Sequence, residues 1–223
     1  MSILSNKYIH DLRTFPGDAR LAWERRGAAG VWREFSARTV RRVYERTVSV
    51  VLDHDLDSVV DVPVPDGIHF TSFTEADEPA LARVAPQDAQ RRLRVARERG
   101  REVTLAWRGN AVVGWAILSF EMADDLERYP VALPPATVYG WHGSVISGER
   151  GRGTGAALVR WRGRLAREMG ATRMRVIIER HNDAALRMAR RCFTRSRVVG
   201  EVRTLRFLRS ERFAYRETET GAP

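Results

Sequence analysis

Arginine and glycine alternate over residues 150–155, where the chain reads R-G-R-G-T-G. Such a loop can bind an anion at the start of a helix, because the first backbone N–H groups of a helix lack partners and carry partial positive charge. The three glycines let the backbone turn tightly and come close to a ligand. Arg150 and Arg152 can add charge-assisted hydrogen bonds. The residue types therefore predict a site for a phosphate or a pyrophosphate.

The flanking sequence predicts the elements that position this loop. Residues 137–147 read T-V-Y-G-W-H-G-S-V-I-S and are rich in β-branched and aromatic residues, which is typical of a strand. After the loop, apolar residues recur at close to helical spacing with arginines between them. We expect Leu158, Trp161, Leu165 and Met169 to form the apolar side of that helix. The unit is thus predicted to be strand, glycine loop and helix.

The spacing of the loop residues separates several phosphate-binding motifs. No lysine follows the glycines, so the loop is not a P-loop, and the spacing also differs from the dinucleotide pattern G-x-G-x-x-G. Arg150, Gly153 and Gly155 do fit the pattern R-x-x-G-x-G. On this motif the sequence resembles the GCN5-related N-acetyltransferase (GNAT) superfamily. In that family the loop between the fourth strand and the third helix holds the pyrophosphate of acetyl-coenzyme A.

The resemblance implies an α/β fold. Its sheet is mixed and mostly antiparallel, is splayed between the fourth and fifth strands, and is flanked by helices. The order of predicted elements agrees with this fold: a strand at 68–73, two helices between residues 74 and 100, a hairpin over 103–120, the central strand, loop and helix, a strand at 173–179, a helix opened by Asn182, and one or two strands over 197–207.

Three segments are predicted along the chain. Residues 1–60 form an N-terminal helical extension with one strand at 47–52, and residues 61–212 form the GNAT domain. Residues 213–223 form a polar tail. The stretch after residue 52 is predicted to be a linker. His54 stands there among Asp53, Asp55 and Asp57, but neighbours in an extended chain point to opposite faces, so no metal site is expected.

The resemblance also assigns cofactor-binding residues. The pantetheine arm is expected to pair with the backbone at Val145, Ile146 and Ser147, and a backbone N–H near residues 143–145 is expected to polarise the thioester carbonyl. A second family motif matches Asn182 with Ala185. The full set of expected cofactor-binding residues is Val145, Ile146, Ser147, Arg150, Gly151, Arg152, Gly153, Thr154, Gly155 and Asn182. A branched side chain at Gly153 is expected to block the pyrophosphate.

The catalytic groups are less well marked by the sequence. Seven residues after Asn182 the family often has a tyrosine that protonates the leaving thiolate, but this chain has Ala189. Tyr139 is a candidate acid or hydrogen-bond donor, since a tyrosine titrates near pH 10. His142 has a suitable pKa for a base. Strand alternation places it on the face opposite Tyr139 unless a bulge at Gly140 or Gly143 reverses it.

Composition limits the partners. The formal net charge of +10 is nearly all arginine, because Lys7 is the only lysine. This charge favours an anionic ligand such as coenzyme A. Nucleic acid is not expected as a partner, because no recognition motif accompanies the charge. Cys192 is the only cysteine and is expected in the core, and a chain without disulfides suits the cytoplasm. No apolar run reaches transmembrane length.

The sequence therefore predicts an acetyl-coenzyme A-dependent N-acetyltransferase. It would transfer the acyl group directly to an amine of a small molecule or peptide, and it is compatible with a homodimer. The alternative is a non-catalytic acyl-coenzyme A sensor of the same fold, which the absence of the usual tyrosine at Ala189 favours.

Overall fold

The computed structural model describes residues 28, 44–123, 126, 127, 129, 131–207 and 210–218. The chain divides into two compact units, residues 1–47 with 203–214 and residues 48–202 with 215–223. The larger unit contains every candidate site residue named above. Residues 1–27 and 29–43 of the predicted N-terminal helical extension lie outside the described residues.

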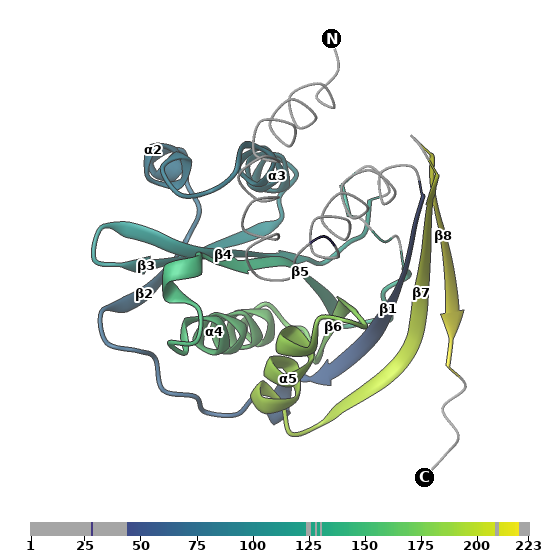
Figure 1. The fold of residues 1–223 in the computed structure, drawn as a ribbon. Helices are drawn as coiled ribbons and strands as arrows, with labels where there is room; N and C mark the ends of the chain where they lie inside the picture. Colours follow the sequence, from purple (N-terminus) through teal and green to yellow (C-terminus); the bar gives the residue numbers. More distant parts are fainter. Residues whose placement is uncertain are drawn as a thin grey trace. The chain divides into compact units, whose positions relative to one another are not determined.

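A mixed sheet of eight strands forms the centre of the fold, in the order β2-β3-β4-β5-β6-β1-β7-β8 (Figure 1). Pairing is antiparallel for β2–β3, β3–β4, β4–β5 and β1–β6, and parallel for β5–β6. The strands are β1 (Tyr44–Asp55), β2 (Ile68–Ser72), β3 (Glu102–Arg108), β4 (Ala111–Ser119), β5 (Thr137–Val145), β6 (Arg173–Glu179), β7 (Ser196–Phe207) and β8 (Ser210–Glu217).

Helices cover both faces of this sheet. The α-helices are α2 (Glu78–Ala82), α3 (Gln87–Glu98), α4 (Thr154–Glu168) and α5 (Asp183–Cys192), and the 3-10 turns are η1 (Leu56–Ser58), η2 (Glu75–Asp77) and η3 (Ser147–Glu149). Helices α2 and α3 lie on one face, and α4 and α5 lie on the other (Figure 1). Each pair buries its own apolar cluster against the strands.

Local signals fix several of these boundaries. The backbone N–H of Thr74 donates to the Asp77 carboxylate at 2.8 Å, which is one half of the predicted capping box. Pro86 precedes α3 and Gly100 follows it with a φ of 71°, a conformation that glycine adopts without strain. The predicted strand at 173–179 is confirmed as β6. The predicted α/β fold with a mixed sheet is confirmed for the described residues.

The buried side of α4 differs from the prediction. Trp161 and Met169 are 38% and 50% exposed, whereas Leu158, Arg162 and Ala166 are buried at four-residue spacing. The Trp161 ring instead stacks on the Phe70 ring, with 5.3 Å between their centroids. Gly163 lets α4 pack closely, since a Cβ there would lie 3.0 Å from Val59.

Two strands also extend beyond the prediction. β1 continues through Asp55, so Asp53 and His54 belong to a strand and not to a linker. The cause is pairing with β6, which places Asp53 opposite Arg175. β8 reaches Glu217 and therefore includes residues that were expected in the polar tail.

Candidate functional site

β5 and β6 separate soon after they begin to pair. Their parallel pairs are Thr137 with Arg173, Val138 with Met174, and Tyr139 with Arg175. β5 then continues through residues 140–145 without pairing to β6, while β6 continues beside β1. The backbone edge of residues 140–145 is therefore open on that side. This is the predicted splay, and it lies between the strands that correspond to the fourth and fifth of the resembled fold.

A bulge in β5 turns His142 toward α3. Ile117 of β4 pairs with Trp141, but Trp115 pairs with Ser144, so β5 holds one residue more than β4 between these pairs. His142 has a φ of 49°, which is uncommon outside glycine. The pKa of His142 is lowered to about 4, mainly by burial and also by the nearby charge of Arg92, while Asp88 acts in the opposite direction. His142 therefore lies near α3 and is neutral at physiological pH.

Tyr139 and Trp141 pack into the core on the same face. Tyr139 is 3% exposed and Trp141 is 7% exposed. Their rings are nearly parallel, with centroids 6.3 Å apart. The indole N–H of Trp141 donates to Ser119 Oγ at 2.7 Å. The geometry thus gives these two aromatic side chains a packing role, and it leaves His142 as the half-buried polar group of this stretch.

The glycine loop ends at the N-terminus of α4. Gly151 and Gly153 have φ angles of 78° and 86°, which favour glycine. Gly153 is the N-cap of α4, and among the described residues no side chain caps the helix. The first backbone N–H groups of α4 thus lack a side-chain acceptor. A Cβ on Gly153 would lie 3.3 Å from Pro65, so substitution there disturbs the loop even without a ligand.

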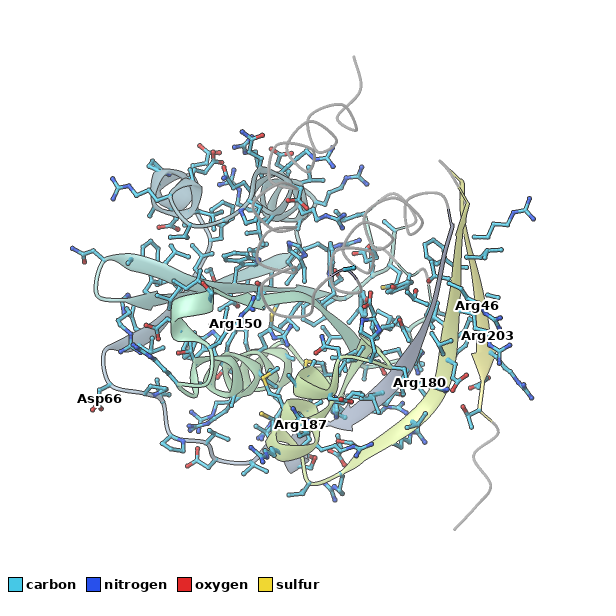
Figure 2. All side chains as sticks on the ribbon, in the orientation of Figure 1. Arg46, Asp66, Arg150, Arg180, Arg187 and Arg203 are labelled. Carbon is cyan, nitrogen blue, oxygen red and sulfur yellow. The ribbon has the colours of Figure 1, made fainter. Side chains whose placement is uncertain are left out.

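Charged side chains surround this helix end. The Arg150 Nε donates to the Val145 carbonyl at 3.3 Å, and Figure 2 shows Arg150 on the side of the sheet that carries α4. Arg152 is largely exposed, with Nη1 3.5 Å from Glu149. The Glu149 carboxylate accepts two hydrogen bonds from Arg108, at 3.0 and 2.8 Å, which lower its pKa. Because Arg108 neutralises Glu149, the two loop arginines leave the site positively charged.

The last residues of β5 present backbone groups to the open edge. The Ile146 N–H donates to the Val113 carbonyl on β4. Since neighbouring residues in a strand direct their backbone groups to opposite sides, Val145 directs its N–H and C=O away from β4. The Val145 carbonyl, which the sequence assigned to pantetheine, accepts a hydrogen bond from Arg150 in this structure. Ser147 is exposed and begins η3.

Asn182 serves first as a helix cap. Its Oδ1 accepts a hydrogen bond from the Ala185 N–H at 3.2 Å, which fixes the start of α5. Ala189 and Cys192 lie one turn apart on the buried side of that helix. Cys192 is fully buried, as expected, and burial raises its pKa.

Comparison with known proteins decides the family. A family model described as the acetyltransferase (GNAT) family matches residues 68–193, more than half of the chain. The chain belongs to the GNAT family. The match begins at β2 and ends just after α5, so it includes the splay and the glycine loop and leaves out β1, β7 and β8.

Solved structures show the same fold at low identity. A Drosophila protein is similar with a TM-score of 0.56 and 11% identity, over 83% of this chain and 68% of that one. A GCN5-related N-acetyltransferase from Sphaerobacter thermophilus has a TM-score of 0.51 and 16% identity, over 83% and 56%. A GCN5-related glucosamine N-acetyltransferase region of a fungal multi-domain GH3 β-N-acetylglucosaminidase has a TM-score of 0.51 and 19% identity, over 78% of this chain and 22% of that one. No curated protein matches the sequence.

Within this GNAT fold, Arg162 is a polar residue that the sequence analysis missed. It is 6% exposed, and its Nε and Nη1 have no hydrogen-bond partner among the described residues. The available signal was its position four residues after Leu158 and four before Ala166. An arginine on the buried stripe of an amphipathic helix is unusual, because charged groups are seldom buried without a partner.

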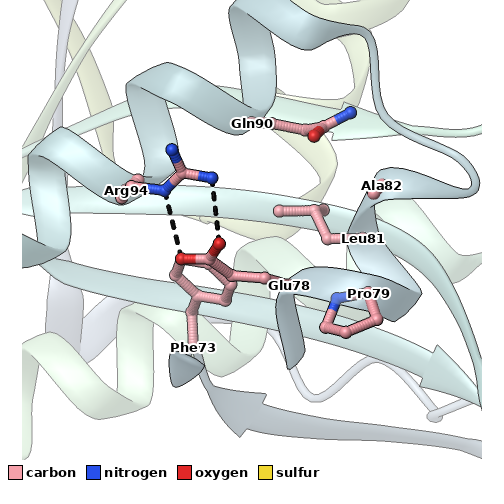
Figure 3. Close-up of a pocket in the computed structure, with 7 residues that line it drawn as sticks. All are labelled: Phe73, Glu78, Pro79, Leu81, Ala82, Gln90 and Arg94. Carbon is pink, nitrogen blue, oxygen red and sulfur yellow. Dashed lines mark hydrogen bonds and ion pairs between the residues drawn. The ribbon is translucent and has the colours of Figure 1, made fainter. Parts of the chain in front are cut away.

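Two hollows lie on the GNAT domain away from the splay. One has a volume of about 240 Å³ and lies between α2 and α3, where Arg94 makes a two-point contact with Glu78 at 3.1 and 2.9 Å (Figure 3). The other, of about 510 Å³, is lined by β2, the start of η2 and the β3–β4 turn. No residue of the glycine loop or of the open stretch of β5 lines either hollow.

Other features of the described residues bear on ligands. No group of three or more histidine, cysteine or acidic side chains there could hold a metal ion, and His54 instead stacks on Phe193 with 4.3 Å between ring centroids. Among the helices of these residues, none has the length and apolarity needed to cross a membrane.

Proposed function

We propose that this protein is an acetyl-coenzyme A-dependent N-acetyltransferase that transfers the acyl group directly to an amine of a small molecule or peptide. One observation carries the proposal: the open backbone edge of β5 leads into an uncapped helix N-terminus with two positive-φ glycines and two arginines. A long ligand with an amide-bearing arm and a pyrophosphate at its end matches these two features in the same order along the chain.

The residues of this chain fit coenzyme A. The backbone N–H groups at the start of α4 would bind the pyrophosphate, because they lack a side-chain acceptor and lie at the positive end of the helix dipole. Arg150 and Arg152 would add charged hydrogen bonds. The open edge at residues 140–145 would pair with the amides of the pantetheine arm. Arg150 would release the Val145 carbonyl as it turns toward the phosphates.

Acetyl-coenzyme A would supply an acyl group activated as a thioester. The Val145 N–H points to the open edge, where it could polarise a carbonyl oxygen. His142 is placed on the α3 side of the strand, and its imidazole is neutral at physiological pH, so Nε2 can accept a proton or a hydrogen bond from an amine. The amine would therefore approach from the side of α2 and α3.

The low pKa of His142 has a direct consequence for activity. A base must be neutral to work, so activity through His142 is present above pH 4 and is lost as pH falls through about 4. A loss of activity centred near pH 6.5, the ordinary pKa of histidine, would contradict this role. Protonation of the amine substrate also lowers activity at acid pH. This second effect is distinguished by repeating the pH profile with amines of different pKa.

Cofactor binding is tested by calorimetric titration with coenzyme A. Arg150→Ala and Arg152→Ala should each weaken binding about 10- to 100-fold, since a hydrogen bond to a charged group contributes about 1.5–3 kcal/mol. Arg164→Ala is the matched control, because Arg164 is on the outer side of α4 and 55% of its side chain is exposed. Equal affinity of all four proteins would remove the loop from the cofactor site.

Turnover is tested by thiol release over a panel of amines. Measurable release that needs both acetyl-coenzyme A and an amine supports the proposal. His142→Gln should lower kcat and leave the affinity for coenzyme A unchanged. Tight binding of acetyl-coenzyme A without release for any amine would instead favour the acyl-coenzyme A sensor.

A further inference from the structure

Arg162 carries a buried charge that forms no ion pair with the described residues. Its side chain extends from the middle of α4, and the residue is 6% exposed. In the part of the chain that the structure describes, neither Nε nor Nη1 has a hydrogen-bond partner. Burying a charged group without hydrogen bonds costs several kcal/mol. A fold that keeps such a group therefore keeps it at a cost to its own stability.

The guanidinium lies against the open stretch of β5. A Cβ on Gly140 would lie 3.4 Å from Arg162 Nη1, and a Cβ on Gly143 would lie 3.8 Å from Nη1 and 3.9 Å from Nη2. Both glycines lie after Tyr139, the last residue of β5 that pairs with β6, so they belong to the open stretch of β5. The absence of side chains at both positions makes room for the guanidinium. Arg162 thus borders the splay from the α4 side, and His142 borders it from the α3 side.

The groups that interact electrostatically with Arg162 are His54 and Cys192, and neither is a carboxylate. Among the described residues, no acidic side chain forms an ion pair with it. Met174 of β6 lies against Gly140 on the same side, with its sulfur 3.0 Å from a Cβ built there. Burial lowers the pKa of Arg162 to about 10, and the nearby Cys192 raises it. The guanidinium therefore remains protonated near neutral pH.

Acyl transfer from a thioester to an amine creates a negative charge at the sulfur. The new C–N bond forms and the C–S bond breaks. The electron pair of the C–S bond leaves with the sulfur as a thiolate, and the proton of the amine passes to a base or to solvent. A buried cation beside the gap stabilises this charge more than one in water would, because the local dielectric is low.

We propose that Arg162 binds the departing thiolate of coenzyme A in the splay between β5 and β6. This inference rests on the proposed function. Ala189, on the buried face of α5, has no proton to give. A permanent cation removes the need for a proton donor, because it stabilises the leaving thiolate as an anion. The thiolate would then accept hydrogen bonds from Nε and Nη1 of Arg162, the two nitrogens that have no partner among the described residues.

The pKa of the thiol of bound coenzyme A tests this role without turnover. It is measured from the ultraviolet absorbance of the thiolate as pH is raised, with the complex of desulfo-coenzyme A as the blank. Arg162→Met removes the charge and keeps an unbranched side chain. A cation within about 4–6 Å lowers the pKa of an acid by about 1–3 units, so the bound thiol of the variant should titrate at least about one unit higher.

Three further variants and measurements separate this role from a structural one. Arg162→Lys retains the charge and should retain most of the lowered thiol pKa. Arg164→Met, an exposed arginine on the same helix, should leave it unchanged. Arg162→Met should lower kcat about 100-fold with little change in the KM for acetyl-coenzyme A, while its melting temperature stays equal or rises.

The outcomes are distinct. Equal thiol pKa values in the wild type and in Arg162→Met overturn the role of Arg162 and leave the proposed function intact. Failure of the wild type to bind coenzyme A overturns both. If Arg162→Met keeps the thiol pKa but loses a preference for succinyl- over acetyl-coenzyme A, the guanidinium binds a carboxylate on the acyl chain, and the thiolate role is wrong.

Discussion

Two buried arginines lie near the splay on opposite faces of the sheet, and their surroundings differ. Arg175 of β6 makes two hydrogen bonds to the Asp53 carboxylate, at 2.7 and 2.9 Å, and one to the Ala132 carbonyl at 2.7 Å. Arg162 of α4 has no partner for Nε or Nη1 within the described ranges of the chain. Both residues are 6% exposed. Equal burial therefore does not mean an equal role.

The difference indicates which arginine serves the fold. Arg175 lies where β5 and β6 still pair, opposite Tyr139, and it ties β6 to β1. Its charge is compensated within the protein, so it has nothing left to offer a ligand. Arg162 lies where the strands have separated, and its charge is not compensated. Arg175 therefore stabilises the pairing of β6 with β1, and Arg162 is available to an anion that enters the gap between β5 and β6.

Removal of the partner of Arg175 should have the largest effect. Asp53→Asn would leave a buried guanidinium without a counter-charge, which makes Arg175 similar to Arg162. Loss of one partner of a buried pair costs about 3–5 kcal/mol, so the free energy of unfolding in urea should fall by that amount. Asp61→Asn is the control, because Asp61 pairs with Arg160 but its side chain is 81% exposed. A similar loss for both variants would contradict the comparison.

A second prediction concerns His54, which lies next to Asp53 on β1. The pKa of His54 is lowered from 6.5 to about 4, mainly by burial; Asp53 opposes this shift and Arg162 adds to it. The unfolded chain therefore binds the proton first as pH falls. The stabilisation is fully present above 6.5 and is lost as pH falls through about 4.

The size of this effect follows from the pKa difference. Between pH 7 and pH 5 the wild type should lose roughly 2 kcal/mol through His54, at 1.36 kcal/mol per pKa unit. His54→Gln should lose less over the same range, measured by urea unfolding at both values. Equal losses would show that His54 is not the source, and would point to His142, whose pKa is lowered to about 4 in the same way.

Removal of the unpaired charge should have the opposite sign. Arg162→Met should raise the free energy of unfolding by on the order of 1 kcal/mol, because it replaces an uncompensated buried cation with an apolar side chain of similar shape. Arg175→Met should lower it, since Asp53 then loses both hydrogen bonds from Arg175 and keeps only the ion pair with Arg197 at 3.8 Å. Thermal unfolding of the two variants measures the contrast. A loss of stability in both would mean that the two arginines play the same structural role.

The sequence predicted those parts of the fold that local signals mark. Thr74, Pro86, Gly100 and Asn182 stand at helix ends, and the glycine loop separates β5 from α4. These residues act within one or two turns of their own position, so the sequence around them is sufficient. The loop motif and the splay were predicted from the same local pattern together with the family resemblance.

The parts that the sequence did not predict depend on distant contacts. Asp53 looked like a linker residue, because its strand exists through pairing with Arg175, which is 122 residues away in the chain. Arg162 looked like one of several solvent-exposed arginines, because only the packing of α4 on β5 shows that it is buried. The bulge that turns His142 toward α3 depends on the register between β4 and β5.

The smallest predicted effect is a change in the pKa of His54. It tests the comparison of the two arginines most directly, because both Asp53 and Arg162 act on this imidazole. Asp53 raises the pKa of His54 and Arg162 lowers it. Arg162→Met should therefore raise this pKa, and Asp53→Asn should lower it, each by on the order of one unit or less. A proton NMR titration of the imidazole ring measures both shifts. The added stability expected of Arg162→Met helps that variant to remain folded at acid pH. Arg164→Met should leave the value unchanged. If Arg162→Met lowers the pKa of His54 or leaves it unchanged, Arg162 is not an uncompensated charge in the folded protein, and the contrast with Arg175 fails.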